Sequence, residues 1–305
     1  MEFIPKKTGN FIYDALLWLR KNAKRIDILC VYHAIMRSSL QALVYKLFNP
    51  RGKVYVKLDG WPFPNQGSLW KRPFYRWLMK HADCVSTELE ENAELLSRKW
   101  GRRVICVPNP SKPNELQPFR PFSERSNTIL TVGRLGTHQK ATEILLEAFA
   151  QIAAKIPNWT LKLAGRTEEN TNIAEEFYAE HPELKDRVIF PGEIRDRQTL
   201  IDMYRDAKIF AFPSRHEGCP LALTEALTHG LFAVTSNILP HKSMTENFRY
   251  ALGSEVDDID GLAKNLFYAC THEAETESLA HEGMTATRER IDLRRCCNVI
   301  AEELK

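Results

Sequence analysis

The sequence predicts an α/β protein made of two doubly wound domains, each with a parallel β-sheet between layers of helices. Short apolar runs alternate with helical patterns from Phe11 onward, which is the rhythm of β-α-β units. A polar, proline-rich stretch without apolar periodicity interrupts this rhythm between Pro108 and Asn127. The chain has 305 residues, which is enough for two domains of ordinary size.

The N-terminal domain, residues 1–110, is expected to be shortened. Its strands are predicted at residues 26–32, 53–58, 84–86 and 104–107. It begins with a helical pattern, whereas a doubly wound domain normally begins with a strand and a glycine-rich turn. We therefore expect this first strand and turn to be missing or to be supplied elsewhere, for example by a partner chain that completes the domain.

The C-terminal domain, residues 128–284, is expected to be complete, and a linker over residues 111–127 precedes it. Its strands are predicted at residues 128–132, 160–164, 188–190, 209–212 and 232–235, each followed by a loop and usually a helix. Two helical patterns end the chain, at residues 259–270 and 285–303. We expect residues 285–305 to pack back across the domain junction.

Composition excludes several classes of protein. Lys and Arg number 42 and Asp and Glu 39, so the formal net charge of +3 gives no field that would attract nucleic acid. The 7 cysteines form no CxxC pair, which argues against a disulfide framework or a zinc site and for a reducing compartment. The sequence has no apolar run of membrane-spanning length, and its N-terminus lacks the apolar core of a signal peptide. We expect a cytoplasmic protein.

The stretch 213–227 places two glutamates eight positions apart across a turn into a helix. Glu217 lies on the predicted loop and Glu225 within the predicted helix. The first amides of that helix, those of Leu221 and Ala222, have no partner within the helix and carry the positive end of its dipole, so they can bind a phosphate. Taken alone, two such glutamates are more often solvated surface residues.

Two cations follow the first strand of the C-terminal domain, Arg134 just beyond the strand and Lys140 where the next helix begins. Ligands of open α/β sheets bind at the carboxyl edge, so both cations can converge there with the helix start after Glu217. With a helix dipole they supply roughly two and a half positive charges, which balances a nucleoside diphosphate without a metal. The alternative is that Arg134 and Lys140 are solvated surface residues without a ligand. Asp258-Ile-Asp260 matches a metal-binding Asp-x-Asp pattern but precedes a helix, where Asp is an ordinary cap.

Short motifs along this domain are similar to those of glycosyltransferase family 4. They are Val132-Gly-Arg-Leu135, the Arg-x5-Lys spacing of residues 134 and 140, Leu163-Ala-Gly165, Phe190-Pro-Gly192, and Glu-Gly-x-x-Leu with Glu-x7-Glu over residues 217–225. The resemblance covers roughly Ile26 to the C-terminus. It implies the GT-B fold, which pairs two Rossmann-like doubly wound domains, the N-terminal one shortened here.

The resemblance implies a binding site for a nucleotide sugar in the C-terminal domain. Arg134 and Lys140 would bind the donor diphosphate, and Glu217 would contact the hydroxyls of the donor sugar; these three would be the catalytic residues. Glu225 would contact the ribose. The rest of the implied donor site consists of Gly133, Gly192, Glu193, Ile194, Gly218, Cys219, Leu221 and Ala222, with the backbone of 192–194 holding the base.

The resemblance also implies a reaction. Family members retain the anomeric configuration, by a front-face attack in which the leaving phosphate oxygen takes the acceptor proton, so no protein nucleophile is required. The implied function is transfer from a UDP- or GDP-linked sugar to a glycan or lipid-linked acceptor in surface polysaccharide synthesis, with no cofactor or metal. Two alternatives stay open: a catalytically incomplete nucleotide-sugar-binding subunit or truncated remnant, and a sugar epimerase, for which the sequence offers no dedicated acid–base set.

The sequence departs from the family pattern at the acceptor side and at one helix start. Asp59 stands where many relatives carry a histidine near the acceptor, so it is an acceptor-side candidate; the alternative is an Asp that only forms a turn. His33 is a second acceptor-side candidate, and its alternative is a histidine without a catalytic role. Cys219-Pro220 stands where many members have an aromatic residue and a glycine, and Pro220, placed at the first helical position, removes a phosphate-binding amide. Residues 69–80 mix aromatic and basic side chains, which fits peripheral contact with the inner membrane face or a packed helix.

Overall fold

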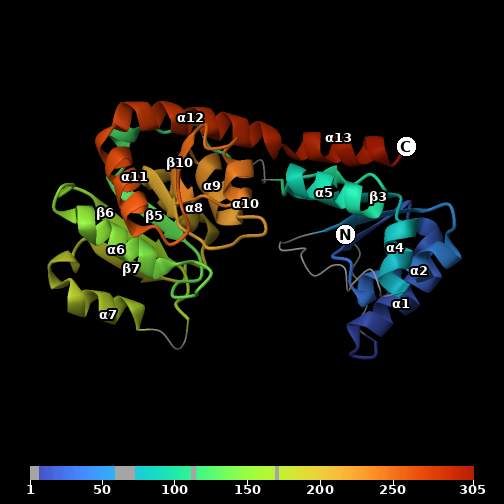
Figure 1. Cartoon of the computed structure of the whole chain (residues 1–305). Helices are drawn as coiled ribbons and strands as arrows, with labels where there is room; N and C mark the ends of the chain where they lie inside the picture. The colour runs from blue at the N-terminus through green and yellow to red at the C-terminus, as the bar shows by residue number, and fades with distance from the viewer. Residues whose placement is uncertain (1–6, 59–72, 111–114, 169–171) are drawn as a thin grey trace. The chain divides into compact units, whose positions relative to one another are not determined.

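The structure is a computed structural model, and it describes residues 7–58, 73–110, 115–168 and 172–305. The chain forms two compact units (Figure 1), residues 1–109 together with 294–305, and residues 110–293. Each unit contains a parallel β-sheet, which confirms the predicted α/β fold class. Among the described residues, no helix is both long enough and apolar enough to cross a bilayer.

The sheet of the first unit has the strand order β1-β2-β3-β4. Its strands are β1 (Ile28–Tyr32), β2 (Lys53–Lys57), β3 (Cys84–Thr87) and β4 (Ile105–Cys106). The helices of this unit are α1 (Phe11–Asn22), α2 (Met36–Phe48), α4 (Pro73–His81), α5 (Glu90–Trp100) and α13 (Leu293–Glu303), with a 3-10 turn over Ala23–Arg25. All four strands predicted for this half are present, although β4 is shorter than the predicted 104–107.

The alternation of side chains along each strand divides this sheet into two faces. One face carries residues such as Val56 and Val85, which are buried against α2, α4 and α5. The opposite face carries Tyr55 and Cys84, which are buried against α13 through side chains such as Cys296. The C-terminal helix of the chain therefore packs on the sheet of the N-terminal unit.

The sheet of the second unit has the order β10-β9-β8-β5-β6-β7. Its strands are β5 (Thr128–Val132), β6 (Thr160–Ala164), β7 (Val188–Gly192), β8 (Ile209–Phe212), β9 (Phe232–Ser236) and β10 (Ala251–Ser254). Its helices are α6 (Thr142–Ala153), α7 (Ile173–Glu180), α8 (Arg197–Asp206), α9 (Leu221–Thr228), α10 (Leu239–Met244), α11 (Ile259–Thr271) and α12 (Glu273–Arg290), with 3-10 turns over Phe122–Glu124 and Pro182–Leu184.

Two features of this unit differ from the sequence predictions. Strand β10 was not predicted, because its four residues contain a glycine and no β-branched side chain. The helical pattern over residues 285–303 belongs to two helices, since α12 ends at Arg290 and α13 begins at Leu293.

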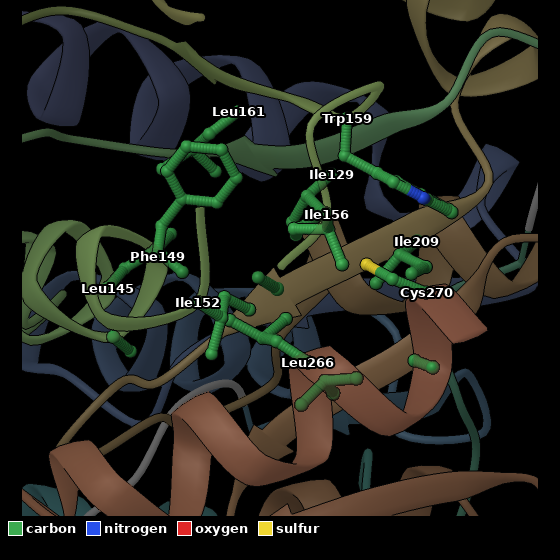
Figure 2. Packing of buried hydrophobic residues seen from close by; sticks show 14 of the residues in the cluster. Ile129, Leu145, Phe149, Ile152, Ile156, Trp159, Leu161, Ile209, Leu266 and Cys270 are labelled. Carbon is green, nitrogen blue, oxygen red and sulfur yellow. The ribbon is translucent and has the colours of Figure 1, made fainter. Parts of the chain in front are cut away.

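A hydrophobic core fixes the central strands of the second unit. Figure 2 shows Phe149 of α6 and Leu266 of α11 in one buried cluster with Ile129 of β5 and Ile209 of β8. All four side chains have 0% exposure. Burial of each such side chain contributes about 1.5–3 kcal/mol relative to exposure, so β5 and β8 are held firmly side by side. The loops that leave their carboxyl ends therefore start from fixed points.

The aromatic and basic segment 69–80 is described only from Pro73 onward, where it forms α4. This helix buries Tyr75, Leu78 and Met79, whereas Phe74 is 44% exposed. The segment is therefore a packed helix ahead of β3, one of the two alternatives that the sequence left open. Contact of its exposed side with a membrane stays a prediction.

Candidate functional site

The strand order of the second unit brings two distant loops together. Strand β5 pairs with β8, with Ile129 opposite Ile209, although the two strands are far apart in sequence. From β5 the chain proceeds through β6 and β7 on one side and then returns through β8, β9 and β10 on the other. The β5–β8 pair is thus the point where strand order reverses, and ligands of open α/β sheets bind outside the carboxyl ends of such a pair.

An ion pair joins the loops at this point. The Nζ atom of Lys140, in the loop after β5, donates a hydrogen bond to Oε1 of Glu217, in the loop after β8. Both side chains are largely buried, with 16% exposure for Lys140 and 7% for Glu217. The same ammonium lies 4.3 Å from the centre of the Phe212 ring, a cation–π contact that holds it at the end of β8. The structure therefore brings together two of the residues that the sequence singled out.

Gln139 connects the third residue, Arg134, to the same loops. The Arg134 guanidinium is exposed and donates to Oε1 of Gln139 at 2.8 Å. The side-chain Nε2 of Gln139 donates to the carbonyl oxygen of His216 at 3.0 Å, and the backbone carbonyl oxygen of Gln139 accepts from the backbone N–H of Arg215 at 2.9 Å. Gln139 thus bridges the loops after β5 and β8 while it orients Arg134.

Arg215 ties the loop after β8 to three other segments. Its guanidinium donates to the His138 carbonyl oxygen at 2.7 Å, to Oε1 of Glu143 at 2.6 Å and to Oδ1 of Asp257 at 2.7 Å. Burial alone would lower the pKa of Arg215, but these two carboxylates raise it above its usual value. Sequence reasoning missed both Arg215 and Gln139, because their partners are known only once the strand order is known.

Glycines let the loops after β5, β6 and β7 approach one another. A Cβ on Gly165 would lie 1.7 Å from the carbonyl oxygen of Gly133, and the φ of Gly165 is +146°, so only glycine fits there. The Gly165 amide donates to the Gly192 carbonyl oxygen at 2.9 Å. A Cβ on Gly133 would in turn lie 3.3 Å from Cε of Lys140. The close approach of these backbones therefore positions the Lys140 stem.

Glu225 lies in a second charged group. Nη2 of Arg197, the first residue of α8, lies 2.9 Å from Oε1 of Glu225 and 2.8 Å from Oε2 of Glu115. Hydrogen bonds to Glu115 and then Glu225 raise the pKa of the Arg197 guanidinium. The Glu225 side chain keeps 32% exposure. Arg197 and Glu115 were not expected from the sequence.

The start of α9 differs from the expectation in one respect. Pro220 is the N-cap rather than the first helical residue, with φ −77° and ψ 79°, the geometry of an inverse γ-turn. This turn lets the Leu221 amide donate to the Cys219 carbonyl oxygen at 2.9 Å, so the expectation of a free Leu221 amide is wrong. Within the described residues, the amides of Ala222 and Leu223 make no hydrogen bond and point out of the first turn.

The remaining predicted residues lie elsewhere or are not described. His33 follows β1 in the first unit, is exposed and adopts φ +59°. Asp59 lies outside the described residues. Glu193, beside Gly192, is half-exposed and pairs with Arg195 at 3.0 Å. Asp258 accepts from the Gly261 amide at 2.9 Å, which confirms the interpretation of Asp258-Ile-Asp260 as a helix cap.

His241 of α10 is a buried neighbour of this site. Its Nδ1 lies 3.0 Å from the Ser236 carbonyl oxygen, which can only accept, so Nδ1 carries the proton of the neutral ring. Its Nε2 is buried without a hydrogen-bond partner in the part of the chain that the structure describes. Burial, and to a smaller extent the charge of Lys140, lower the pKa of His241 to about 4.

This depressed pKa predicts that His241 contributes to acid sensitivity. The unfolded chain binds the histidine proton near pH 6.5 and the folded chain only near pH 4, so stability is lost as the pH falls through that window. His241→Asn keeps a donor for Ser236. The free energy of unfolding, measured by urea denaturation, decreases between about pH 7 and pH 5 in both proteins. We expect this decrease to be about 2 kcal/mol smaller in His241→Asn than in the wild type. An equal loss in both proteins would contradict the assignment.

The family model for glycosyl transferases group 1 matches residues 114–283, more than half of the chain. The chain belongs to this family. An uncharacterized glycosyltransferase of Haemophilus influenzae is 30% identical over 265 residues, which cover 86% of this chain and 71% of the relative. The range matched by the family model, residues 114–283, contains Lys140, Glu217 and the two bridging residues, Gln139 and Arg215.

Two further comparisons concern this group 1 glycosyltransferase. The lipopolysaccharide core biosynthesis mannosyltransferase LpcC of Rhizobium leguminosarum is 25% identical over 179 residues, which cover 54% of this chain and 47% of that protein. The solved structure of HepE from Anabaena, in complex with UDP and glucose, superposes with a TM-score of 0.73 and 17% identity over 95% of this chain and 80% of HepE. The chain spans under half of LpcC, and the similarity to HepE establishes the shared GT-B fold.

Proposed function

We propose that the chain is a retaining, metal-independent glycosyltransferase of family 4 that transfers a sugar from a UDP- or GDP-linked donor to a glycan or lipid-linked acceptor. The observation that carries this proposal is the buried Lys140–Glu217 pair at the β5–β8 switch point. It stands where an open α/β sheet binds its ligand. It also joins a cation suited to phosphate with a carboxylate suited to sugar hydroxyls.

The charges at this point suit a nucleoside diphosphate. Lys140 and Arg134 supply two positive charges, of which the Glu217 carboxylate offsets one. The amides of Ala222 and Leu223, which have no partner among the described residues, add the positive end of a helix dipole. A leaving diphosphate gathers negative charge as the sugar–oxygen bond breaks, so groups aimed at it before the reaction lower the barrier. In this proposal the residues of the protein balance the negative charge of the diphosphate.

Glu217 is proposed to hold the donor sugar rather than to transfer a proton. Its carboxylate is already engaged with Lys140, and an ionised carboxylate can accept several hydrogen bonds at once. Hydroxyls of the donor sugar would bind to the remaining lone pairs, next to the phosphate that Lys140 holds. The leaving phosphate oxygen would then take the acceptor proton on the same face of the sugar, with retention of configuration.

The acceptor and the cellular setting are proposed from the relatives. LpcC is named for lipopolysaccharide core synthesis, and the family resemblance implies assembly of surface polysaccharide. We propose a glycan or lipid-linked acceptor, used in the cytoplasm with peripheral contact at the inner membrane face. The exposed side of α4, with Phe74 and Lys80, is the surface that such contact would use.

The proposal is tested by NMR of the reaction product. The protein is incubated with UDP- and GDP-linked hexoses and with glycan or polyprenyl-diphosphate glycan acceptors, with and without EDTA. We expect one donor to give a product with the anomeric configuration of the donor and an unchanged rate in EDTA. An inverted product would contradict the retaining mechanism, and loss of transfer in EDTA would contradict metal independence.

Arg197 gives a prediction specific to the nucleoside end of the donor. Its ion pair holds Glu225, which is proposed to contact the ribose, so Arg197→Met should raise KM for the nucleotide sugar about tenfold, a loss of about 1.4 kcal/mol, and change kcat little. Arg249→Met is the matched control, because Arg249 also pairs with two carboxylates, Glu246 and Glu282, outside the site loops. Steady-state kinetics with varied donor measures both. An unchanged KM in Arg197→Met would remove Glu225 from the donor site.

A second candidate function is a donor-binding subunit that does not complete transfer alone. The observation that favours it is the sheet of the first unit, which within the described residues has four strands with β1 at the edge. The described part of the donor unit has six strands by contrast. Calorimetry together with the transfer assay separates the two functions: a subunit binds a nucleotide sugar with the same dependence on Lys140 but gives no product with any acceptor.

A further inference from the structure

The first unit contains a cavity of about 770 Å³ between the last turn of α4, the residues that follow α5 and the end of α13. We call it the α4–α5 pocket; its lining residues fall within 73–82 and 100–103 and include Glu303. Helix α4 leads into β3 and α5 leads into β4, so the pocket lies at the amino edge of this sheet. Ligands of open α/β sheets bind at the opposite, carboxyl edge. The pocket is therefore separate from the edge at which substrates of the proposed reaction bind.

Two cations of the α4–α5 pocket have no counter-charge among the described residues. Arg76 and Lys80 are both exposed, and their side chains form no ion pair and no hydrogen bond with any described residue. They are four positions apart on α4 and therefore share one side of the helix, where two like charges repel each other. An anion bound between them would remove this repulsion.

The other charges around the pocket balance one another. Arg103 pairs with Glu303, with 3.2 Å between Nε and Oε2. Cations near the end of a helix commonly complement its dipole, and Arg102 already does so, because it donates to two carbonyl oxygens at the end of α4. Its charge offsets the negative ends of α4 and α5, which amount to about half a charge each. Arg76 and Lys80 therefore leave the pocket with an excess of roughly two positive charges.

Two indole rings form an apolar wall of the pocket. Trp77 stacks on the ring of His81 with 4.7 Å between the centroids, and Nδ1 of His81 donates to the Trp77 carbonyl oxygen at 2.8 Å. Trp100 makes an edge contact with Tyr75, with 6.2 Å between the centroids. Both indoles line the pocket and are partly exposed. Flat rings held in this way offer a surface for the apolar face of a sugar ring or for an alkyl chain.

These features together fit a ligand that joins a phosphate group to an apolar or ring-shaped part. A phosphate supplies about one to two negative charges, and a guanidinium can bind two of its oxygens at once. The volume of the pocket lies within the usual range of small-molecule sites, so there is room for more than the phosphate.

We propose that the α4–α5 pocket binds an organic phosphate, with the phosphate between Arg76 and Lys80 and the attached part against Trp77 and Trp100. Such a ligand has two sources, a soluble sugar phosphate and the headgroup of an anionic phospholipid. This inference rests on the first unit alone and is independent of the donor site.

The two tryptophans of the pocket provide a local measurement. The full chain is labelled with 5-fluorotryptophan and followed by fluorine NMR, and Trp77→Phe and Trp100→Phe assign the two resonances. Three separate titrations use glucose 1-phosphate, glucose, and dihexanoyl phosphatidylglycerol below its micelle concentration. We expect saturable shifts of both resonances with at least one of the two phosphates and no shift with glucose. The resonance of Trp159, in the core of the second unit, should stay unchanged.

Two double variants with the same loss of charge locate the binding site. Arg76→Gln combined with Lys80→Gln removes the two cations without a counter-charge and should weaken binding at least about tenfold. Arg98→Gln combined with Lys99→Gln removes two cations from the last turn of α5, outside the pocket, and should leave the affinity within about twofold of the wild type. All four side chains are exposed, so both variants should fold.

The titrations also distinguish the two sources of the phosphate. A response to glucose 1-phosphate that is lost in the α4 double variant assigns a soluble sugar phosphate, and the same behaviour with phosphatidylglycerol assigns a lipid headgroup; either result supports the proposal. Absence of a response to both phosphates would overturn it. Equal affinity for glucose and glucose 1-phosphate, or equal affinity of the two double variants, would overturn it as well.

Discussion

Lys140→Met is expected to lower kcat for sugar transfer about 100-fold or more while the protein stays folded. Its ammonium is the buried cation beside Glu217 at the switch point, and removal of one pre-positioned charge from the leaving group of a transfer reaction typically costs a factor of about 10² to 10³. The substitution also leaves the Glu217 carboxylate buried without its partner, which is a separate cost in stability. Kinetics and thermal unfolding of the same preparation separate the two effects.

Lys208→Met is the matched control for this variant. Lys208 is also buried and also paired, with Nζ 2.6 Å from Glu273, but it precedes β8 and lies at the opposite edge of the same sheet. We expect Lys208→Met to lower the melting temperature at least as much as Lys140→Met and to keep most of the transfer activity at a temperature where it is folded. Near-normal transfer by Lys140→Met would remove the lysine from the reaction.

Gly165→Ala is expected to have the largest effect on stability. The new methyl group would overlap the carbonyl oxygen of Gly133, and the φ of +146° is strained for any L side chain. Because the clash is with backbone, the loop after β5 or the loop after β6 must move. We expect a loss of at least about 3 kcal/mol in the free energy of unfolding. Donor affinity should also fall, since Gly133 contacts the Lys140 stem.

Gly192→Ala separates backbone strain from overlap. Gly192 has φ +78°, but a Cβ there would meet no atom within 4 Å. Gly192→Ala should therefore lower the free energy of unfolding by only about 1 kcal/mol, the usual cost of a side chain at positive φ. Urea denaturation of both variants is the measurement. Losses of equal size would show that the contact between Gly133 and Gly165 does not determine the stability of these loops.

The parts of this fold that the sequence predicted depend on local pattern. Apolar runs bounded by turn residues located the strands from β5 to β9, and the rule that ligands bind at the carboxyl edge placed Lys140 and Glu217 at one edge before their contact was known. The helix cap at Asp258 was also readable, because a side chain that caps a helix needs only the three residues that follow it.

The parts that the sequence did not predict depend on contacts between distant segments or on backbone torsions. Gln139 and Arg215 are ordinary surface residue types, and their bridging role follows from the pairing of β5 with β8. The bond from Leu221 to Cys219 follows from the ψ of Pro220, which residue identity does not fix. Strand β10 has no β-branched residue and forms because β9 offers an edge.

The site differs from its prediction in how the charges are arranged. The sequence suggested three independent ligands for a donor, Arg134, Lys140 and Glu217. In the structure Lys140 and Glu217 form a pair, and Arg134 is oriented through Gln139. A site assembled in this way before the ligand arrives loses less conformational entropy on binding. Because they form one ion pair, Lys140 and Glu217 are expected to act together in donor binding.

We propose that the β5–β8 switch point binds a nucleoside diphosphate through Lys140. Calorimetric titration of the wild type, Lys140→Met and Lys208→Met with UDP, GDP and their sugar derivatives tests this proposal. We expect saturable binding of one nucleotide series to the wild type and Lys208→Met, and at least about tenfold weaker binding to Lys140→Met. Failure of both series to bind, or equal affinity in the wild type and Lys140→Met, would contradict it.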